Sequence, residues 1–209
     1  QTAPVPGITI AHCPLIISAS DVTIRYIRSR LYTDRSGPTG REWEDSCARA
    51  MTPGFMPDNV ALFAGAHKVI LDHVSMGWGM DEIFDVEEGA GDYTLQWSII
   101  AEGGTYGVPD NDNPQEMASQ AYGTFLTGES PNGTLHHNLL AHNKERNPKI
   151  DSGATYDVRN NVVYNWNLSG TAHAGLSAPV NMNFIGNTYL PGLDSNIGNT
   201  APNGSFTLR

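Results

Sequence analysis

The feature of this chain that most limits its fold is an internal repeat of short strand-like runs. The runs align so that their fourth residues are Ser98, Asn138, Asn161 and Asn187. Asn138 and Asn161 are 23 residues apart, and Asn161 and Asn187 are 26 residues apart. A period in the low twenties built from β-rich units is typical of a solenoid, in which each turn buries its inner face against its neighbours.

The recurrent asparagine has a physical explanation in such a fold. Its amide can bond to the same amide one coil above, and asparagine tolerates left-handed backbone geometry. The 3.6-residue period of an amphipathic helix is absent. The alternative all-β fold is a sandwich of hairpins, which predicts Asn-Gly turn pairs, and these occur only at Asn132-Gly133 and Asn203-Gly204. The repeat therefore predicts an all-β solenoid.

The repeat also predicts the domain organisation. We expect a single domain over residues 1–209, with loop insertions near residues 32–58 and 103–120 that are rich in Pro, Gly and acidic residues. A solenoid needs capping segments at both ends. Because the chain starts and stops inside the pattern, we expect its terminal caps to be missing and the sequence to be a segment of a longer protein.

Composition excludes several partners. The formal net charge is −10, which argues against nucleic acid because phosphate binding needs a basic face. No run of eighteen apolar residues exists, so no membrane partner is expected. The two cysteines, Cys13 and Cys47, form no CxxC metal motif; they can pair in an oxidising compartment or remain two buried thiols.

As to oligomeric state, we expect the protein to be a monomer.

Several stretches of the sequence carry a family resemblance. They are Val69–Glu82 (VILDHVSMGWGMDE), Leu95–Glu102 (LQWSIIAE), Leu135–His142 (LHHNLLAH), Arg146-Asn147-Pro148 and Asp157–Trp166. Together they resemble polysaccharide lyase family 1, most closely the subset once named pectate trisaccharide-lyases, in order over nearly the whole chain. The resemblance implies a right-handed parallel β-helix. It also implies a secreted, Ca²⁺-dependent pectate lyase that cleaves de-esterified homogalacturonan, the polygalacturonate of pectin, by β-elimination.

The same resemblance assigns a metal site. The family's calcium ligands fall on Asp58, Asp81 and Asp85, and Glu82 is a neighbour that could contribute. Calcium prefers several hard oxygen ligands, and a bound cation would let an acidic protein hold an acidic polysaccharide. Met56 stands where the family often has another acid, which leaves the site one carboxylate short unless Glu42, Glu44 or Asp45 folds in. Without the neighbouring family-like stretches, Asp81, Glu82 and Asp85 would be interpreted as an ordinary solvated acidic turn.

The resemblance also assigns the catalytic and substrate-binding residues. Arg146 matches the catalytic arginine, and Lys149 matches a second basic residue that grips a substrate carboxylate; the alternative for this pair is a surface ion pair with Glu145. The family's lysine before Tyr-Gly is replaced by Met117. The alternative function is therefore a non-catalytic β-helix that binds acidic polysaccharide. A hydrolytic polygalacturonase is the third and least favoured function, because such enzymes need a Gly-His-Gly motif and none occurs in this sequence.

Other conspicuous residues are interpreted as structural. We expect Asp72 and His73 to serve packing or hydrogen bonding. His136 and His137 are expected to point to opposite faces of a strand, so that they cannot bind one ion together. The tryptophans Trp78, Trp97 and Trp166 are expected to be stacked aromatics of the core or of a groove.

Overall fold

Short runs rich in valine, isoleucine, leucine and threonine form strands along most of the chain, and no helix interrupts them in the part that the structure describes. The structure is a computed structural model. It describes residues 7–31, 58–63, 65–87, 89–103, 108–109, 117–118, 121–126, 132–151, 155–170, 172–173 and 180–196, with the backbone alone at 108–109, 117–118 and 172–173. Within these residues no helix is long and apolar enough to cross a membrane.

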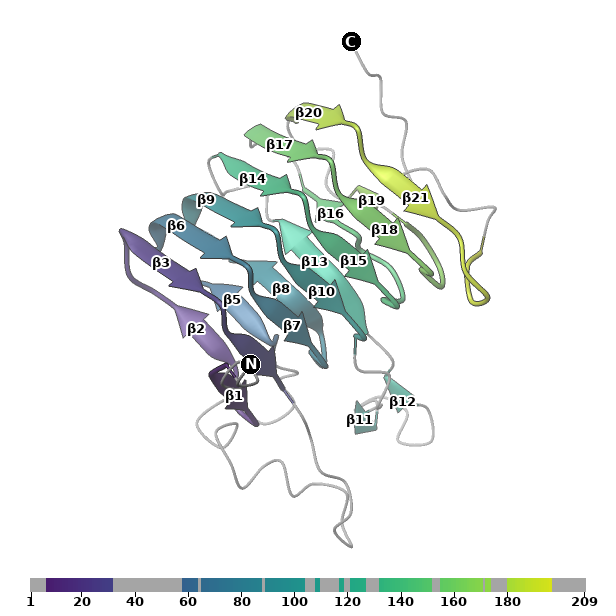
Figure 1. Ribbon diagram of the computed structural model, residues 1–209, viewed down its shortest axis with the longest axis horizontal. Helices are drawn as coiled ribbons and strands as arrows, with labels where there is room; N and C mark the ends of the chain where they lie inside the picture. Colours follow the sequence, from purple (N-terminus) through teal and green to yellow (C-terminus); the bar gives the residue numbers. More distant parts are fainter. Residues whose placement is uncertain are drawn as a thin grey trace, which may run out of the picture.

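The strands pair in register into three parallel sheets, and the chain visits the sheets in the same order in each coil (Figure 1). Sheet 1 contains β2 (Leu15–Ile17), β5 (Val60–Leu62), β8 (Glu82–Val86), β13 (Tyr122–Leu126), β16 (Lys149–Ile150) and β19 (Ala172–His173). Sheet 2 contains β3 (Val22–Arg25), β6 (His67–Asp72), β9 (Gly91–Gln96), β14 (Gly133–His136), β17 (Thr155–Arg159) and β20 (Asn181–Ile185). Sheet 3 contains β1 (Thr9–Ala11), β4 (Arg28–Arg30), β7 (Ser75–Gly77), β10 (Ile99–Ala101), β15 (Leu139–Ala141), β18 (Val162–Tyr164) and β21 (Thr188–Leu190).

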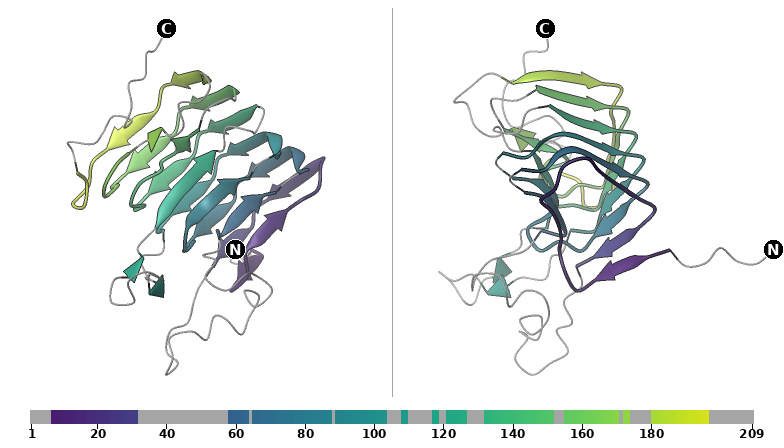
Figure 2. Two further views of the ribbon diagram at one scale, coloured as in Figure 1. Left: turned by 180° about the vertical axis from the view of Figure 1, so that it is seen from behind. Right: turned by 90° about the vertical axis from the view of Figure 1, so that its left-hand side faces the viewer.

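The architecture is the expected right-handed parallel β-helix, and the hairpin sandwich is wrong. Every pairing within the three sheets is parallel, with each strand paired to the strand one coil away. The one antiparallel pair among the described residues joins β11 (Val108–Pro109) to β12 (Met117–Ala118), inside the second predicted insertion. Figure 2 shows the coils stacked along one axis, with this pair set apart from them.

Rows of apolar side chains fill the inside of the solenoid. Leu71, Leu95, Leu135 and Val158 occupy one register position in four successive coils, and each is at most 1% exposed. Their burial removes apolar surface from water, which stabilises the stack by about 25 cal/mol for each Å². The repeat seen in the sequence is therefore the repeat of the core.

The asparagine ladder is present, and its position corrects the sequence interpretation. The Nδ2 of Asn138 donates to Oδ1 of Asn161 at 3.0 Å, and the Nδ2 of Asn161 donates to Oδ1 of Asn187 at 2.9 Å. The ladder residues themselves are not in the left-handed region. The residue before each of them is, with φ of 57° at His137 and 53° at Asn160. The aligned runs thus straddle the corner between sheet 2 and sheet 3 and are not single strands.

Replacing Asn161 with alanine is expected to lower the free energy of unfolding by about 2–4 kcal/mol. The change removes four side-chain hydrogen bonds, two to Asn138, one to Asn187 and one to the Leu135 carbonyl, inside the solenoid. Urea unfolding followed by circular dichroism measures the loss. Asn183→Ala, at an exposed position of β20, should change stability by less than about 0.5 kcal/mol; equal losses in the two variants would refute the ladder's role.

Candidate metal and catalytic site

The predicted site residues come from successive coils and meet on sheet 1. Glu82 is in register with Tyr122, and Phe125 is in register with both Asp85 and Lys149. Asp58 lies two residues before β5, which pairs with β8, and the backbone N–H of Glu82 donates to Asp58 Oδ1 at 2.9 Å. The parallel register therefore places residues far apart in sequence beside one another.

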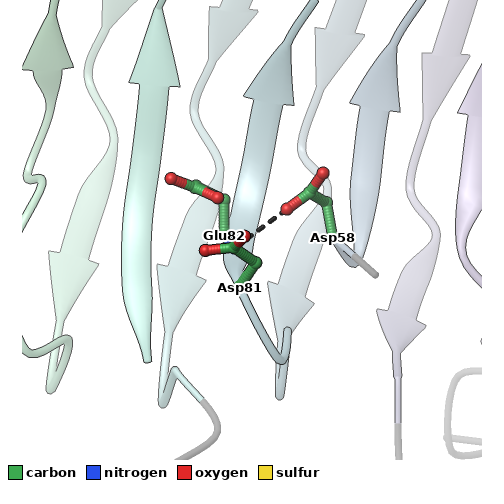
Figure 3. Close-up of side chains that lie close together, drawn as sticks. All are labelled: Asp58, Asp81 and Glu82. Carbon is green, nitrogen blue, oxygen red and sulfur yellow. Dashed lines mark hydrogen bonds between the residues drawn. The ribbon is translucent and has the colours of Figure 1, made fainter. Parts of the chain in front are cut away.

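The acidic residues form one carboxylate cluster made of two groups that share Asp58. Asp58, Asp81 and Glu82 offer oxygen atoms that all lie within 4.8 Å of one another, and Figure 3 shows the three side chains together. Asp58, Asp85 and Glu87 form the second group under the same limit. The three predicted ligands thus lie together around Asp58, although Asp81 and Asp85 belong to different groups.

Burial makes this cluster electrostatically unfavourable without a cation. Burial raises the pKa of Asp58 well above its ordinary value, and the carboxylates of Asp85 and Glu82 raise it further. Burial, followed by repulsion from Glu82, raises the pKa of Asp81 to about 8 and likewise that of Asp85 to about 8. Several desolvated carboxylates with oxygen ligands only are the donor set that calcium prefers. The residues present therefore fit a calcium ion.

The guanidinium of Arg146 lies at the edge of the cluster. Its Nη1 forms an ion pair with Glu82 Oε1, and its Cζ lies 3.5 Å from the centre of the Tyr122 ring. Lys149 lies nearby on β16, with Nζ 4.4 Å from the centre of the Phe125 ring. Burial lowers the pKa of Lys149, and the charge of Arg146 lowers it further. Two cations held on aromatic faces beside a carboxylate cluster can contact an anion that also meets a metal held by the cluster.

Three functional candidates beside the cluster were not assigned from the sequence. Glu87 completes the second carboxylate group, and Tyr122 and Phe125 carry the two cations; Glu82, named from the sequence as a possible contributor, completes the first group. The feature that could have identified these residues is the parallel strand register. It can be read from the repeat only after the sheet 1 strands have been aligned with one another.

Some expectations fall on residues that the structure does not place. Glu42, Glu44, Asp45 and Met56 lie outside the described residues. Only the backbone of Met117 is described, in β12. Cys13 is disulfide-bonded, and Cys47 lies outside the described residues. The free-thiol alternative for Cys13 is therefore wrong.

Two structural expectations are settled away from sheet 1. Asp72 does serve hydrogen bonding, because its Oδ1 lies 2.6 Å from His73 Nδ1. The expectation for His136 and His137 is wrong: their Nδ1 atoms lie 2.9 Å apart. The reason is that β14 ends at His136 and His137 has a left-handed φ of 57°, so the two rings turn toward each other.

The tryptophans divide between core and surface. Trp166 is fully buried, whereas Trp78 and Trp97 are 36% and 53% exposed. The indole Nε1–H of Trp78 donates to Glu102 at 2.9 Å. Trp97 stacks on His137.

Comparisons with known proteins identify relatives of this chain. No family model matches the chain. Over 199 residues, 94% of its length, the chain is 33% identical to a protein named probable pectate lyase C from Aspergillus oryzae and 32% identical to one of the same name from Aspergillus flavus. The same name and 32% identity apply to a protein of Aspergillus fumigatus. The chain spans 39% of the length of each of these relatives.

The fold and the carboxylate cluster define a parallel β-helix with a candidate cation site. The relatives narrow this class. The chain is a homologue of the pectate lyases, and the resemblance to that family predicted from the sequence is confirmed.

Proposed function

We propose that this chain is the β-helix core of a secreted pectate lyase that cleaves de-esterified homogalacturonan by calcium-dependent β-elimination. The observation that carries the proposal is the buried carboxylate cluster next to Arg146 on sheet 1. The relatives named as probable pectate lyases support the substrate class. The disulfide at Cys13 supports an oxidising compartment, in keeping with secretion.

The reaction breaks the bond between C4 of a galacturonate unit and its glycosidic oxygen. A base takes the proton at C5, the C4–C5 double bond forms, and the leaving oxygen gains a proton from solvent. The C5 proton is next to a carboxylate, whose full charge makes the proton a poor acid. When bound, calcium supplies charge neutralisation of that carboxylate. Asp58, Asp81 and Glu82 would hold it, with Asp85 and Glu87 as the second group.

The basic side chains do the remaining work in this proposal. The neutral form of Arg146 takes the C5 proton and becomes a guanidinium, or the guanidinium stabilises the enolate-like intermediate that follows removal of this proton; the Tyr122 ring and Glu82 hold the side chain in place. Lys149, held over Phe125, contacts the substrate carboxylate. Lys149 begins β16 and Arg146 lies three residues before it, in contact with Glu82 of the cluster, so one anionic sugar can meet both cations and the cluster.

The proposal predicts a lyase reaction that needs calcium. Polygalacturonate is expected to yield an unsaturated product that absorbs in the ultraviolet, and a chelator is expected to lower the rate by at least about 10²-fold, because charge neutralisation at the carboxylate is lost. Fully methyl-esterified pectin, which has no free carboxylate, should react much more slowly.

A non-catalytic module that binds acidic polysaccharide is the second candidate, favoured by Met117 at the family's lysine position. Unchanged absorbance with and without calcium, from a protein that still binds polygalacturonate, would establish this module and reject the lyase.

A further inference from the structure

The corner between sheet 2 and sheet 3 carries an exposed row of rings. In four successive coils the first residue after the sheet 2 strand is left-handed, with φ of 58°, 55°, 49° and 57° at Tyr26, His73, Trp97 and His137. Because the turn repeats, the rings follow one another with centres 5.1, 6.3 and 4.3 Å apart in that order; the first pair is tilted and the other two are stacked. We call these four residues the corner row. Tyr26 is 62% exposed. Large rings left in water in a continuous row mark an interaction surface.

An open hollow lies along the corner row. Its volume is about 520 Å³, within the range of about 300–1,000 Å³ of ligand sites. Trp97, His137 and Asn160 line one side, and Ile99, Leu139 and Val162 line the other. The three aliphatic residues are in register in successive coils, so the hollow runs parallel to the solenoid axis. It offers an aliphatic floor, and no described residue accepts a hydrogen bond from the indole Nε1–H of Trp97.

Two half-exposed arginines flank the corner row on a chain whose net charge is −10. Arg25 precedes Tyr26, and Arg159 precedes Asn160; both side chains are 50% exposed, and Arg159 Nη2 lies 3.2 Å from Asp157 Oδ2. The pairings place them four coils apart, about 19 Å at ~4.8 Å for each coil. Between them in this register row, the carboxylate of Asp72 is 5% exposed and is bound by Arg25 and His73. A ligand along the row thus meets guanidinium groups at both ends.

We propose that the corner row and the hollow beside it form a second binding surface for an anionic polysaccharide, laid along the solenoid axis. A polymer of repeating sugar acids fits a surface that repeats in each coil. Its apolar ring faces fit the aliphatic floor, its hydroxyls fit the indole and imidazole edges, and its carboxylates fit the arginines. This surface lies on the side of the solenoid away from sheet 1, as the views from front and behind show (Figures 1 and 2). It can hold a chain while sheet 1 acts on another segment.

The test measures binding of long polygalacturonate by isothermal titration calorimetry in the presence of a chelator, which separates it from calcium-dependent binding at sheet 1. Trp97→Ala with His137→Ala is expected to weaken binding about ten-fold or more. Leu139→Glu places a like charge in the hollow at a surface position and should weaken binding similarly without disturbing the core. Trp78→Ala, at another exposed tryptophan, is the matched control and should bind as the unaltered protein does.

Other outcomes overturn the proposal. Equal binding by the Trp97/His137, Leu139 and control variants would refute it, and so would equal affinity for polygalacturonate and for a neutral galactan. Sedimentation that shows a dimer lost on Leu139→Glu, without polysaccharide binding, would make the surface a contact between two copies of this chain. An inactive but polysaccharide-binding protein would refute the lyase and leave this surface standing.

Discussion

Replacing Arg146 with lysine is expected to lower kcat on polygalacturonate by about 10²–10³-fold. Lysine keeps the positive charge but loses the planar fork that pairs with Glu82 and stacks on the Tyr122 ring at 3.5 Å. The lysine side chain is also shorter than that of arginine. Its ammonium would therefore not reach the same place beside C5, and it would not stabilise the negative charge that develops after proton removal. Initial rates of product absorbance at saturating calcium measure the change.

The control for this substitution is Arg28→Lys on sheet 3, an arginine-to-lysine change far from sheet 1, which should leave kcat unaltered. Calcium titration of the Arg146 variant should still show binding, because the carboxylate cluster is intact. Near-normal turnover by Arg146→Lys would exclude both roles proposed for this arginine.

Replacing Asp58 with asparagine is expected to abolish calcium binding at millimolar concentrations and to reduce activity to the level found with chelator. Asp58 is the residue that the two carboxylate groups share, so one change removes a ligand from both. Asparagine keeps an oxygen that can accept the hydrogen bond from the Glu82 N–H, and the backbone therefore needs no rearrangement. Calorimetric calcium titration measures the loss. Asp21→Asn, at an exposed aspartate, is the matched control.

The same variant is expected to be more stable than the unaltered protein when calcium is absent. The folded-state pKa values of Asp81 and Asp85, about 8, lie above the unfolded value of about 3.9, so the folded state binds more protons between these limits. Stability without calcium therefore falls as pH rises from about 4 to about 8, while calcium affinity rises because the ligands must ionise. Thermal unfolding at pH 5 and pH 8 should show a midpoint lower at pH 8 by at least about 2–4 °C, and a smaller difference in Asp58→Asn. A midpoint that rises with pH would contradict this account.

The fold could be predicted from the sequence because the solenoid repeats its chemistry in each coil. Asn138, Asn161 and Asn187 lie at one corner of the solenoid. Because each amide hydrogen-bonds to the equivalent amide of the next coil, asparagine recurs at a regular spacing in the sequence. The left-handed residue before each asparagine shows no recurrent residue type in the sequence. It is a histidine, an asparagine and a glycine in turn (His137, Asn160 and Gly186), because the turn constrains the backbone there and not the side chain.

The site could be predicted only in part. Asp58, Asp81 and Asp85 were assigned from the resemblance to the family, whereas the places of Glu87 and the Tyr122 ring become visible only through strand pairing. Adjacent residues were also assumed to alternate in direction. That assumption fails at His137, where the strand has already ended.

The in-line stacking of β5, β8, β13 and β16 has a consequence for how such a protein can vary. The positions of Asp58 and Tyr122 relative to Glu82 are set by hydrogen bonds between neighbouring strands and between Asp58 and the Glu82 N–H. The lengths of the loops before β5 and before β13 therefore do not set them. Residues can be added or removed in those two connections while the carboxylate oxygens of the cluster keep their spacing. Under the proposed function, specificity for chain length or esterification can then diverge through the connections alone, with the carboxylate cluster unaltered.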